Sequence, residues 1–153
     1  MNGMVRIREA TIEDGEFILS VRNDPTTIAF LHTTTTFDLE NFKQWFLATD
    51  PQMFIIEDKE PVGYLRTKWL EDNVLQVGAD IHPQFRRKGY AQRGYKLLFE
   101  KYPEVKKFNL EVLNHNVIAQ NLYEKLGFVV VREYDYENGM GSTKSIVMEK
   151  TNE

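Results

Sequence analysis

Cysteine is absent from the 153-residue chain, which excludes disulfides, thiolate metal sites and a cysteine nucleophile. Histidine is scarce, and His32, His82 and His115 lie too far apart for a metal-ligand spacing, so we expect no metal. Long apolar runs are also lacking: the run over residues 53–56 is far shorter than the roughly 20 residues of a membrane span. Because the first residues lack the apolar run of a signal peptide, we expect a soluble, cytoplasmic protein without a membrane partner.

Basic residues are outnumbered by acidic ones, which gives a formal net charge of -4 at pH 7. This balance argues against a nucleic-acid partner, since nucleic-acid binders carry a basic surface. Hydrophobic residues make up 42% of the chain and charged residues 27%, an ordinary globular mixture. The length suits one hydrophobic core, and we expect a single domain over residues 1–153.

Periodicity predicts an α/β domain with the order β-α-α-β-β-β-α-β-α-β-β, a mixed and largely antiparallel sheet with helices packed on it. Short turns between consecutive strands in the middle of the chain favour an antiparallel meander. The expected strands cover residues 4–10, 53–57, 62–69, 74–81, 107–113, 128–136 and 143–149, and the expected helices cover about 11–22, 38–47, 90–102 and 116–126.

Local signals mark several boundaries. Residues 11–14 resemble a capping box, and Asp38 is a second candidate helix cap. Residues 33–36 are four threonines, which predict an extended loop between the first two helices. Gly127 occupies the position preferred just after a helix, and Asn138-Gly139 predicts a turn.

The segment Arg86-Arg87-Lys88-Gly89-Tyr90-Ala91 lies between an expected strand and an expected helix. The first N–H groups of a helix lack internal partners, and the helix dipole adds positive charge there, so a phosphate suits this position. Gly89 permits close approach of the backbone, Ala91 keeps the next turn small, and the three cations add charge. The alternative interpretation is a charged, solvated loop before a helix.

The segment lacks the P-loop and GxGxxG patterns but fits arginine-x-x-glycine-x-glycine/alanine. A second segment, from Asn116 through Ala119, Leu122-Tyr123 and Gly127-Phe128, follows after one helix and one strand. With these two segments in this order, the chain resembles the GNAT family of N-acetyltransferases. The resemblance covers about residues 4–150, and its specific motifs lie between residues 74 and 128.

The resemblance implies that the glycine turn holds the pyrophosphate of acetyl-coenzyme A. It also implies that the strand ending at Ile81 splays from its neighbour and offers unpaired amides to the pantetheine arm and the acetyl oxygen. The implied coenzyme-binding residues are Ala79, Asp80, Ile81, Arg86, Arg87, Lys88, Gly89, Tyr90, Ala91, Asn116, Ala119 and Tyr123.

Two catalytic residues are implied by the same resemblance. Tyr123 would be the general acid near the coenzyme sulfur, and Glu111 the general base, acting directly or through water. The alternatives are a core tyrosine and a solvated strand glutamate. Asp80 is a rival base, or a carboxylate that steers an ammonium substrate, or an ordinary strand residue. Asn116 orients the coenzyme or caps a helix.

The acceptor side is less specific. Residues 22–37 and the hairpin over residues 134–142 are candidate walls, with Phe30, His32 and Tyr136 as candidate lining residues. The sequence leaves open whether the acceptor is a small-molecule amine, an amino-sugar nucleotide or a protein N-terminus. A non-catalytic acyl-coenzyme A-binding module is the competing function, and a homodimer through the final strand pair is also open.

Overall fold

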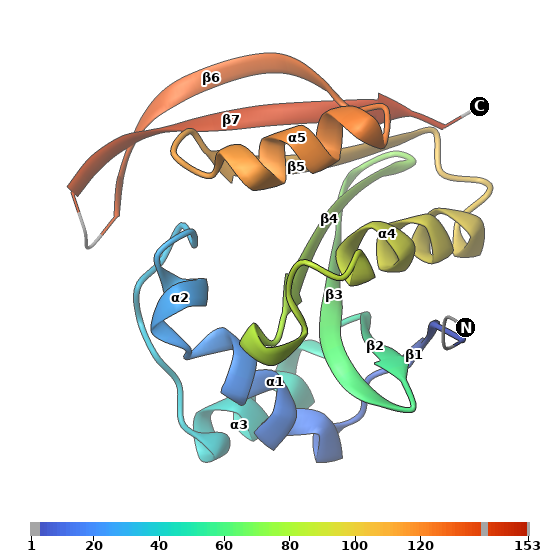
Figure 1. Cartoon of the computed structure of the whole chain (residues 1–153), viewed down its shortest axis with the longest axis vertical. Helices are drawn as coiled ribbons and strands as arrows, with labels where there is room; N and C mark the ends of the chain where they lie inside the picture. Colours follow the sequence, from blue (N-terminus) through green and yellow to red (C-terminus); the bar gives the residue numbers. More distant parts are fainter. Residues whose placement is uncertain (1–3, 139–140, 153) are drawn as a thin grey trace.

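Residues 4–138 and 141–152 are described by this computed structural model, and they form one sheet with helices against both faces (Figure 1). The predicted turn at Asn138-Gly139 lies partly outside these residues. The elements in chain order are β1 (Arg6–Glu9), the 3-10 helix η1 (Ile12–Asp14), α1 (Gly15–Arg22), α2 (Pro25–Ile28), α3 (Leu39–Thr49), β2 (Met53–Asp58), β3 (Glu60–Glu71), β4 (Val74–Ile81), the 3-10 helix η2 (Pro83–Phe85), α4 (Tyr90–Lys101), β5 (Lys107–Leu113), α5 (Val117–Lys125), β6 (Val129–Asn138) and β7 (Gly141–Thr151).

Over the described residues the strands form a seven-stranded sheet of order β1-β2-β3-β4-β5-β7-β6. Every neighbouring pair is antiparallel except β4 and β5, which are parallel. The turns before β3 and β4 contain Lys59 and Asn73 with positive φ, as tight reversals require. The predicted α/β fold with a mixed, largely antiparallel sheet and a central meander is therefore confirmed.

The parallel pair β4–β5 is short. Within the described residues its register covers three pairs, from Val74 with Lys107 to Gln76 with Asn109. Beyond that point residues 77–81 of β4 keep their pairing with β3, where Ile81 lies opposite Gly63. Figure 1 shows β5 and β7 running across the direction of β3 and β4. We call this divergence of the two strands the gap between β4 and β5: along it, the backbone groups of residues 77–81 are not paired by β5.

Two apolar clusters hold the helices on the sheet. The larger cluster lies under α4 and α5 and includes the buried Leu98, Phe108 and Leu110. The smaller cluster lies under α1 and α3 and includes Ile18 and Phe42. Successive side chains of β5 point to opposite faces of the sheet. Phe108, Leu110 and Val112 therefore pack in the larger cluster, while Glu111 faces the other side.

The structure adds one helix that the sequence analysis missed. Asp24 caps the short α2 by accepting from the Thr26 amide at 2.8 Å, and Pro25 occupies its first turn. Asn23-Asp24-Pro25 predicts the end of α1, which the structure confirms, and Asp-Pro also favours the start of a helix. The threonine run lies between α2 and α3 and belongs to no helix or strand, which agrees with the predicted loop.

The predicted caps are present. Thr11 and Asp14 form a reciprocal capping box on η1, and Asp38 and Asn41 form one on α3. Gly127 has φ +101° just after α5. These caps satisfy N–H and C=O groups that helix ends leave without partners.

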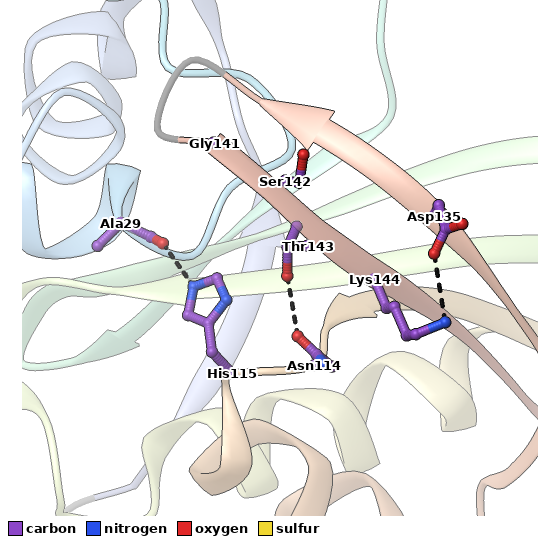
Figure 2. Close-up of a pocket in the computed structure, with 8 residues that line it drawn as sticks. All are labelled: Ala29, Asn114, His115, Asp135, Gly141, Ser142, Thr143 and Lys144. Atoms are coloured by element: carbon purple, nitrogen blue, oxygen red, sulfur yellow. Dashed lines mark hydrogen bonds and ion pairs between the residues drawn. The ribbon is translucent and has the colours of Figure 1, made fainter.

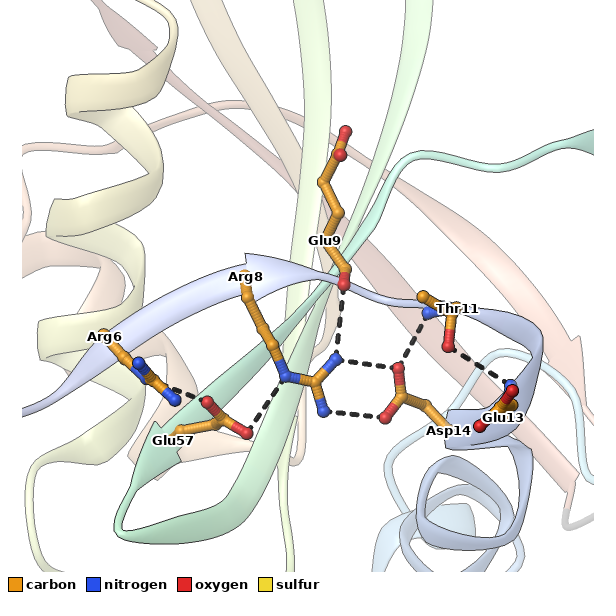
Figure 3. A network of polar contacts seen from close by, with 7 residues as sticks. All are labelled: Arg6, Arg8, Glu9, Thr11, Glu13, Asp14 and Glu57. Carbon is orange, nitrogen blue, oxygen red and sulfur yellow. Dashed lines mark hydrogen bonds and ion pairs between the residues drawn. The ribbon is translucent and has the colours of Figure 1, made fainter.

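A charged network ties β1 and β2 to the start of α1 (Figure 3). Arg8 donates to both carboxylate oxygens of Asp14, at 2.9 and 2.8 Å, and to Glu57 at 3.0 Å. The same Asp14 accepts from the Thr11 amide at 2.7 Å. Hydrogen bonding from Arg8 lowers the pKa of Asp14 below its ordinary value, against the opposing effect of burial.

We predict that Asp14→Asn lowers the free energy of unfolding by about 1–2 kcal/mol at pH 7, because it removes a bidentate charged pair. A lowered folded-state pKa stabilises above the unfolded-state value and loses its effect as the pH falls. The difference between the two proteins should therefore shrink below about pH 4. Urea denaturation across this pH range measures it. Arg6→Gln is the control, because Arg6 is 75% exposed and its ion pair should contribute less than about 0.5 kcal/mol. A difference independent of pH would contradict the prediction.

Candidate active site

The turn before α4 has the geometry of an anion site. Gly89 precedes the helix with φ +79°, and within the described residues no side chain caps this end. A Cβ built on Gly89 would meet nothing nearer than the Arg93 side chain at 3.9 Å, so the space beside it is open. Arg87, Lys88 and Gly89 are exposed around the first amides of α4. Backbone donors, dipole and cations thus converge where the resemblance places a pyrophosphate.

Arg86 has an internal role. Its guanidinium donates to the Ile81 carbonyl at 3.0 Å and to the hydroxyls of Thr26 and Thr27 at 2.5 and 2.8 Å. These three contacts join the end of β4 to α2. Whether Arg86 also meets the coenzyme stays a prediction, as it does for Arg87 and Lys88.

Tyr90 and Arg93 fix the turn from the helix side. The Tyr90 hydroxyl donates to Asp58 at 2.7 Å, so any contact with the coenzyme falls to its backbone. Arg93, which the sequence analysis did not single out, donates to the Lys88 carbonyl at 2.7 Å and lies over the Tyr90 ring.

We expect Arg86→Gln to destabilise the protein by about 2 kcal/mol, because hydrogen bonds of a charged group between two elements are lost. Arg87→Gln is the matched control, since Arg87 is exposed, and its effect should stay within about 0.5 kcal/mol. Chemical denaturation of both variants measures the difference. Equal losses of stability would contradict the internal role of Arg86.

Tyr123 lies on α5 against α4. Its ring packs edge-on against Tyr95, and the Tyr95 hydroxyl donates to the Tyr123 hydroxyl over 3.4 Å. Burial raises the pKa of Tyr123, which therefore stays protonated near neutral pH.

The two other predicted residues of this segment lie beside Tyr123 on the chain. Asn116 caps α5 by accepting from the Ala119 amide at 3.3 Å through its Oδ1 atom. The capping alternative is thus confirmed for Asn116, and its contact with the coenzyme stays a prediction. Ala119 packs partly buried against the larger core cluster.

Glu111 lies on the face of β5 opposite the core residue Leu110, as the strand alternation predicted. Its Oε1 atom accepts from the hydroxyls of Tyr134 and Ser145, the latter at 2.9 Å. His32 Nε2 lies 2.8 Å from the Ser145 hydroxyl. Among the described residues no hydrogen bond reaches Oε2, so one oxygen of the carboxylate is fixed and the other is available.

The tautomer of His32 follows from this chain of contacts. Ser145 has one hydroxyl proton and donates it to Glu111, so the Nε2 atom of His32 is the donor to Ser145. Burial lowers the pKa of His32, which keeps the ring neutral at pH 7. Tyr136 adds a hydrogen bond to the His32 carbonyl at 2.6 Å. His32 and Tyr136 are the expected lining residues of the acceptor site. The structure places His32 Nε2 3.9 Å from Glu111 Oε1 and Tyr136 against His32, and their contact with an acceptor stays a prediction.

The roles of Ser145 and Tyr134 as partners of Glu111 were not predicted. Ser145 is fully buried and lies opposite Leu113 in the β5–β7 register, while Tyr134 lies opposite Ser145 in the β6–β7 register. Both contacts depend on long-range strand pairing, so the sequence near Glu111 carries no signal for them.

Asp80 lies across the gap from Glu111, on the part of β4 that has left β5. Its carboxylate is mostly buried, and Arg66 Nη2 lies 3.5 Å from its Oδ2 atom. Ala79 and Ile81, its neighbours, pack partly buried against the larger core cluster. The gap therefore has one carboxylate on each side, Asp80 with a cation beside it and Glu111 with hydroxyls.

A hollow of about 610 Å³ lies further along the same strands (Figure 2). Thr143 on its β7 wall is two residues from Ser145, and His115 closes another side by bonding to the Ala29 carbonyl at 2.9 Å. The hollow agrees with the expectation that the segment after α1 and the final hairpin form walls. The lining residues are Ala29, Asn114, His115, Asp135, Gly141, Ser142, Thr143 and Lys144.

The chain belongs to the acetyltransferase (GNAT) family, because the sequence profile of that family matches residues 16–128, more than half of the chain and both predicted motifs. The resemblance stated from the sequence is confirmed, and the chain is an N-acetyltransferase by family. A search of curated proteins finds no match.

Solved structures share the fold. A ribosomal-protein-alanine N-acetyltransferase from Brucella melitensis is 20% identical, with a TM-score of 0.83 over 95% of this chain and 99% of that chain. A spermidine N-acetyltransferase from Vibrio cholerae, solved with CoA and spermine, is 17% identical, with a TM-score of 0.88 over 97% and 95%. The yncA structure from Salmonella typhimurium, solved with acetyl-CoA, is 16% identical, with a TM-score of 0.81 over 98% and 95%.

No helix in the parts of the chain that the structure describes is long and apolar enough to cross a membrane.

Proposed function

We propose that the protein transfers an acetyl group from acetyl-CoA directly to a primary amine. The observation that carries this proposal is the early end of the β4–β5 pairing. It is supported by the uncapped glycine turn before α4, by the buried Tyr123 on α5 and by the hydrogen-bonded Glu111 on β5. The neighbours from Salmonella typhimurium and Vibrio cholerae, solved with acetyl-CoA and CoA, support it through their shared fold.

Acetyl-CoA supplies the acetyl group as a thioester. The amine nitrogen forms a bond to the acetyl carbon, and the bond from that carbon to sulfur breaks. The proton of the amine goes to Glu111 through its available Oε2 atom, directly or through water, and the departing thiolate receives a hydrogen bond or proton from Tyr123. Unpaired amides of residues 79–81 are the proposed donors to the carbonyl oxygen as negative charge develops.

The residues around Glu111 suit it to this task. Two hydroxyls fix Oε1 and leave Oε2 oriented, while His32 extends the chain of hydrogen bonds through Ser145. Asp80 is the weaker candidate base, because its carboxylate already has Arg66 Nη2 at 3.5 Å as an ion-pair partner. We assign Glu111 as the base and give Asp80 a steering role.

The alternative is a non-catalytic acyl-CoA-binding module. A module of that kind needs the α4 turn but has no use for an oriented carboxylate and a protonated tyrosine. Their presence favours the enzyme. The acceptor amine, a cytoplasmic location, a single domain over residues 1–153 and a homodimer through the final strands stay predictions.

We predict that Tyr123→Phe lowers kcat by about 100-fold, since general acid–base groups contribute about that much. The affinity for acetyl-CoA should change by less than about threefold, because the ring remains in place. Tyr95→Phe is the matched control: it loses a long hydrogen bond to Tyr123 and should lower kcat only a few-fold. Steady-state kinetics and calorimetry measure both. Unchanged kcat in Tyr123→Phe would remove this residue from catalysis.

Gly89→Asp should weaken acetyl-CoA binding by at least tenfold, because it adds a negative charge beside the phosphate site. Gly89→Asn has the same shape, no charge, and tolerance for positive φ, so its affinity should stay within about threefold of the wild type. Calorimetric titration with acetyl-CoA compares them. Equal affinities for the two variants would mean that the turn before α4 does not hold the phosphates.

A further inference from the structure

A row of polar side chains crosses three strands at the point where β4 and β5 separate. Gln76 on β4 lies opposite Asn109 on β5 in the last pair of the parallel register, and Asn109 lies opposite Glu149 on β7. Gln76 Nε2 donates to Asn109 Oδ1 at 3.2 Å, and Asn109 Nδ2 donates to Glu149 Oε2 at 3.0 Å. We call these three residues the polar row.

The polar row has one direction. An ionised carboxylate only accepts hydrogen bonds, so Asn109 presents its NH2 group to Glu149 and its oxygen to Gln76. Gln76 must then present its own NH2 group to that oxygen. Lys107 Nζ lies 3.3 Å from Glu149 Oε1 at the far end, where a cation suits the carboxylate. The charge of Glu149 therefore orients both amides.

The polar row also selects one register of β4 against β5. Asn109 is buried, with 6% of its surface exposed, and a buried amide is costly without hydrogen-bond partners. A shift of β4 by two residues would bring Val74 or Gly78 opposite Asn109, and a shift by one would bring Leu75 or Val77 there. None of these four residues has a polar side chain. Among these registers, only the observed one gives the buried amide a partner on β4.

This register links the two parts of the proposed site. Gln76 is followed directly by residues 77–81, which β5 does not pair. Glu111 is two residues after Asn109, so strand alternation puts both side chains on one face of the sheet. A shift of one residue along either strand would displace the two parts by about 3.3 Å. A misplacement of about 1 Å can cost about a hundredfold in rate, so the register is critical for the reaction.

We propose that the polar row positions the active site, because it fixes the register of β4 against β5 and so holds the coenzyme-binding backbone of residues 77–81 at a set distance from Glu111. This inference rests on the proposed acetyl transfer. Gln76, Asn109 and Glu149 are positioning residues, since they act through the two strands.

The test inverts one end of the polar row and then both ends. Gln76→Glu keeps the size of the side chain but presents oxygen atoms where the row requires a donor. Adding Glu149→Gln gives a row that runs in the opposite direction: the amide now at position 149 donates to Asn109, whose turned amide donates to the carboxylate at position 76. The two changes together leave the net charge of the protein unchanged.

We expect Gln76→Glu to lower kcat by at least about tenfold, while the affinity for acetyl-CoA stays within about threefold because the turn before α4 is unaltered. Amide hydrogen exchange in residues 74–76 should become at least about tenfold faster. The double variant should return both quantities to within about threefold of the wild type. Two independent losses of stability would add, whereas the polar row predicts that the second change rescues the first.

Two further variants complete the test. Lys107→Gln is the control, because Lys107 is 39% exposed and its loss removes an ion pair but no hydrogen bond of the polar row. It should change kcat and exchange by less than about twofold. Gln76→Leu removes the donor without adding charge, and it serves as the single variant if Gln76→Glu does not fold. It should lower kcat and speed exchange in the same direction.

Unchanged kcat or unchanged exchange in the single variant would overturn the inference. A double variant that does not fold, or that is no better than the single one, would also overturn it. If the wild-type protein acetylates no amine, the proposed function fails, and exchange decides for the polar row. Faster exchange in residues 74–76 that the second change reverses would support its role in setting the register, and unchanged exchange would refute it.

Discussion

The parallel pairing of β4 with β5 ends after three residue pairs, and the rest of the proposed site depends on that limit. A sheet normally satisfies the backbone groups of its inner strands on both sides. Here residues 77–81 retain β3 as a partner but lose β5. The side of residues 77–81 that faces away from β3 is therefore left without strand pairing from β5. In the proposed function, the coenzyme uses these backbone groups.

Groups on each side of the gap are held by different parts of the chain. On the face covered by α4 and α5, Gly89 and the first turn of α4 present backbone N–H groups. Burial raises the pKa of Tyr123 on α5, so its hydroxyl stays protonated. On the other side, Ser145 and Tyr134 from the final hairpin fix Glu111. The catalytic proposal thus needs the β5–β7–β6 register as much as it needs the α4 turn.

Much of the fold was predictable, because it depends on short-range signals. The bounds of β4 and β5 match the expected ranges, since each is a run of suitable residues between turn signals. The two helix caps at Thr11 and Asp38 and the glycine after α5 can also be predicted from a few neighbouring residues. The short α2 escapes prediction because Asp24-Pro25 ends the preceding helix and also begins the next one, and the sequence signals for the two are the same.

The site was predictable where chemistry is stereotyped and unpredictable where it depends on tertiary contacts. A helix start with a glycine turn and nearby cations suits a phosphate, so the segment over residues 86–91 can be proposed as a phosphate site from the sequence, and the structure confirms its turn and helix start. Arg86 belongs to that motif, yet its guanidinium contacts Thr26 and Thr27, some sixty residues earlier in the chain. The contacts of Ser145 and Tyr134 with Glu111 likewise follow from packing between distant segments. Their side chains carry no local signal of these roles.

The most direct test of the account is amide hydrogen exchange over β4, measured with and without acetyl-CoA. The gap is proposed to receive the coenzyme through backbone amides that β5 does not pair. Exchange within residues 77–81 and at the first amides of α4 should therefore slow when acetyl-CoA binds, while exchange in residues 74–76, already paired on both sides, should change little. Binding of acetyl-CoA without protection of residues 77–81 would contradict the account, because the coenzyme would then lie outside the gap.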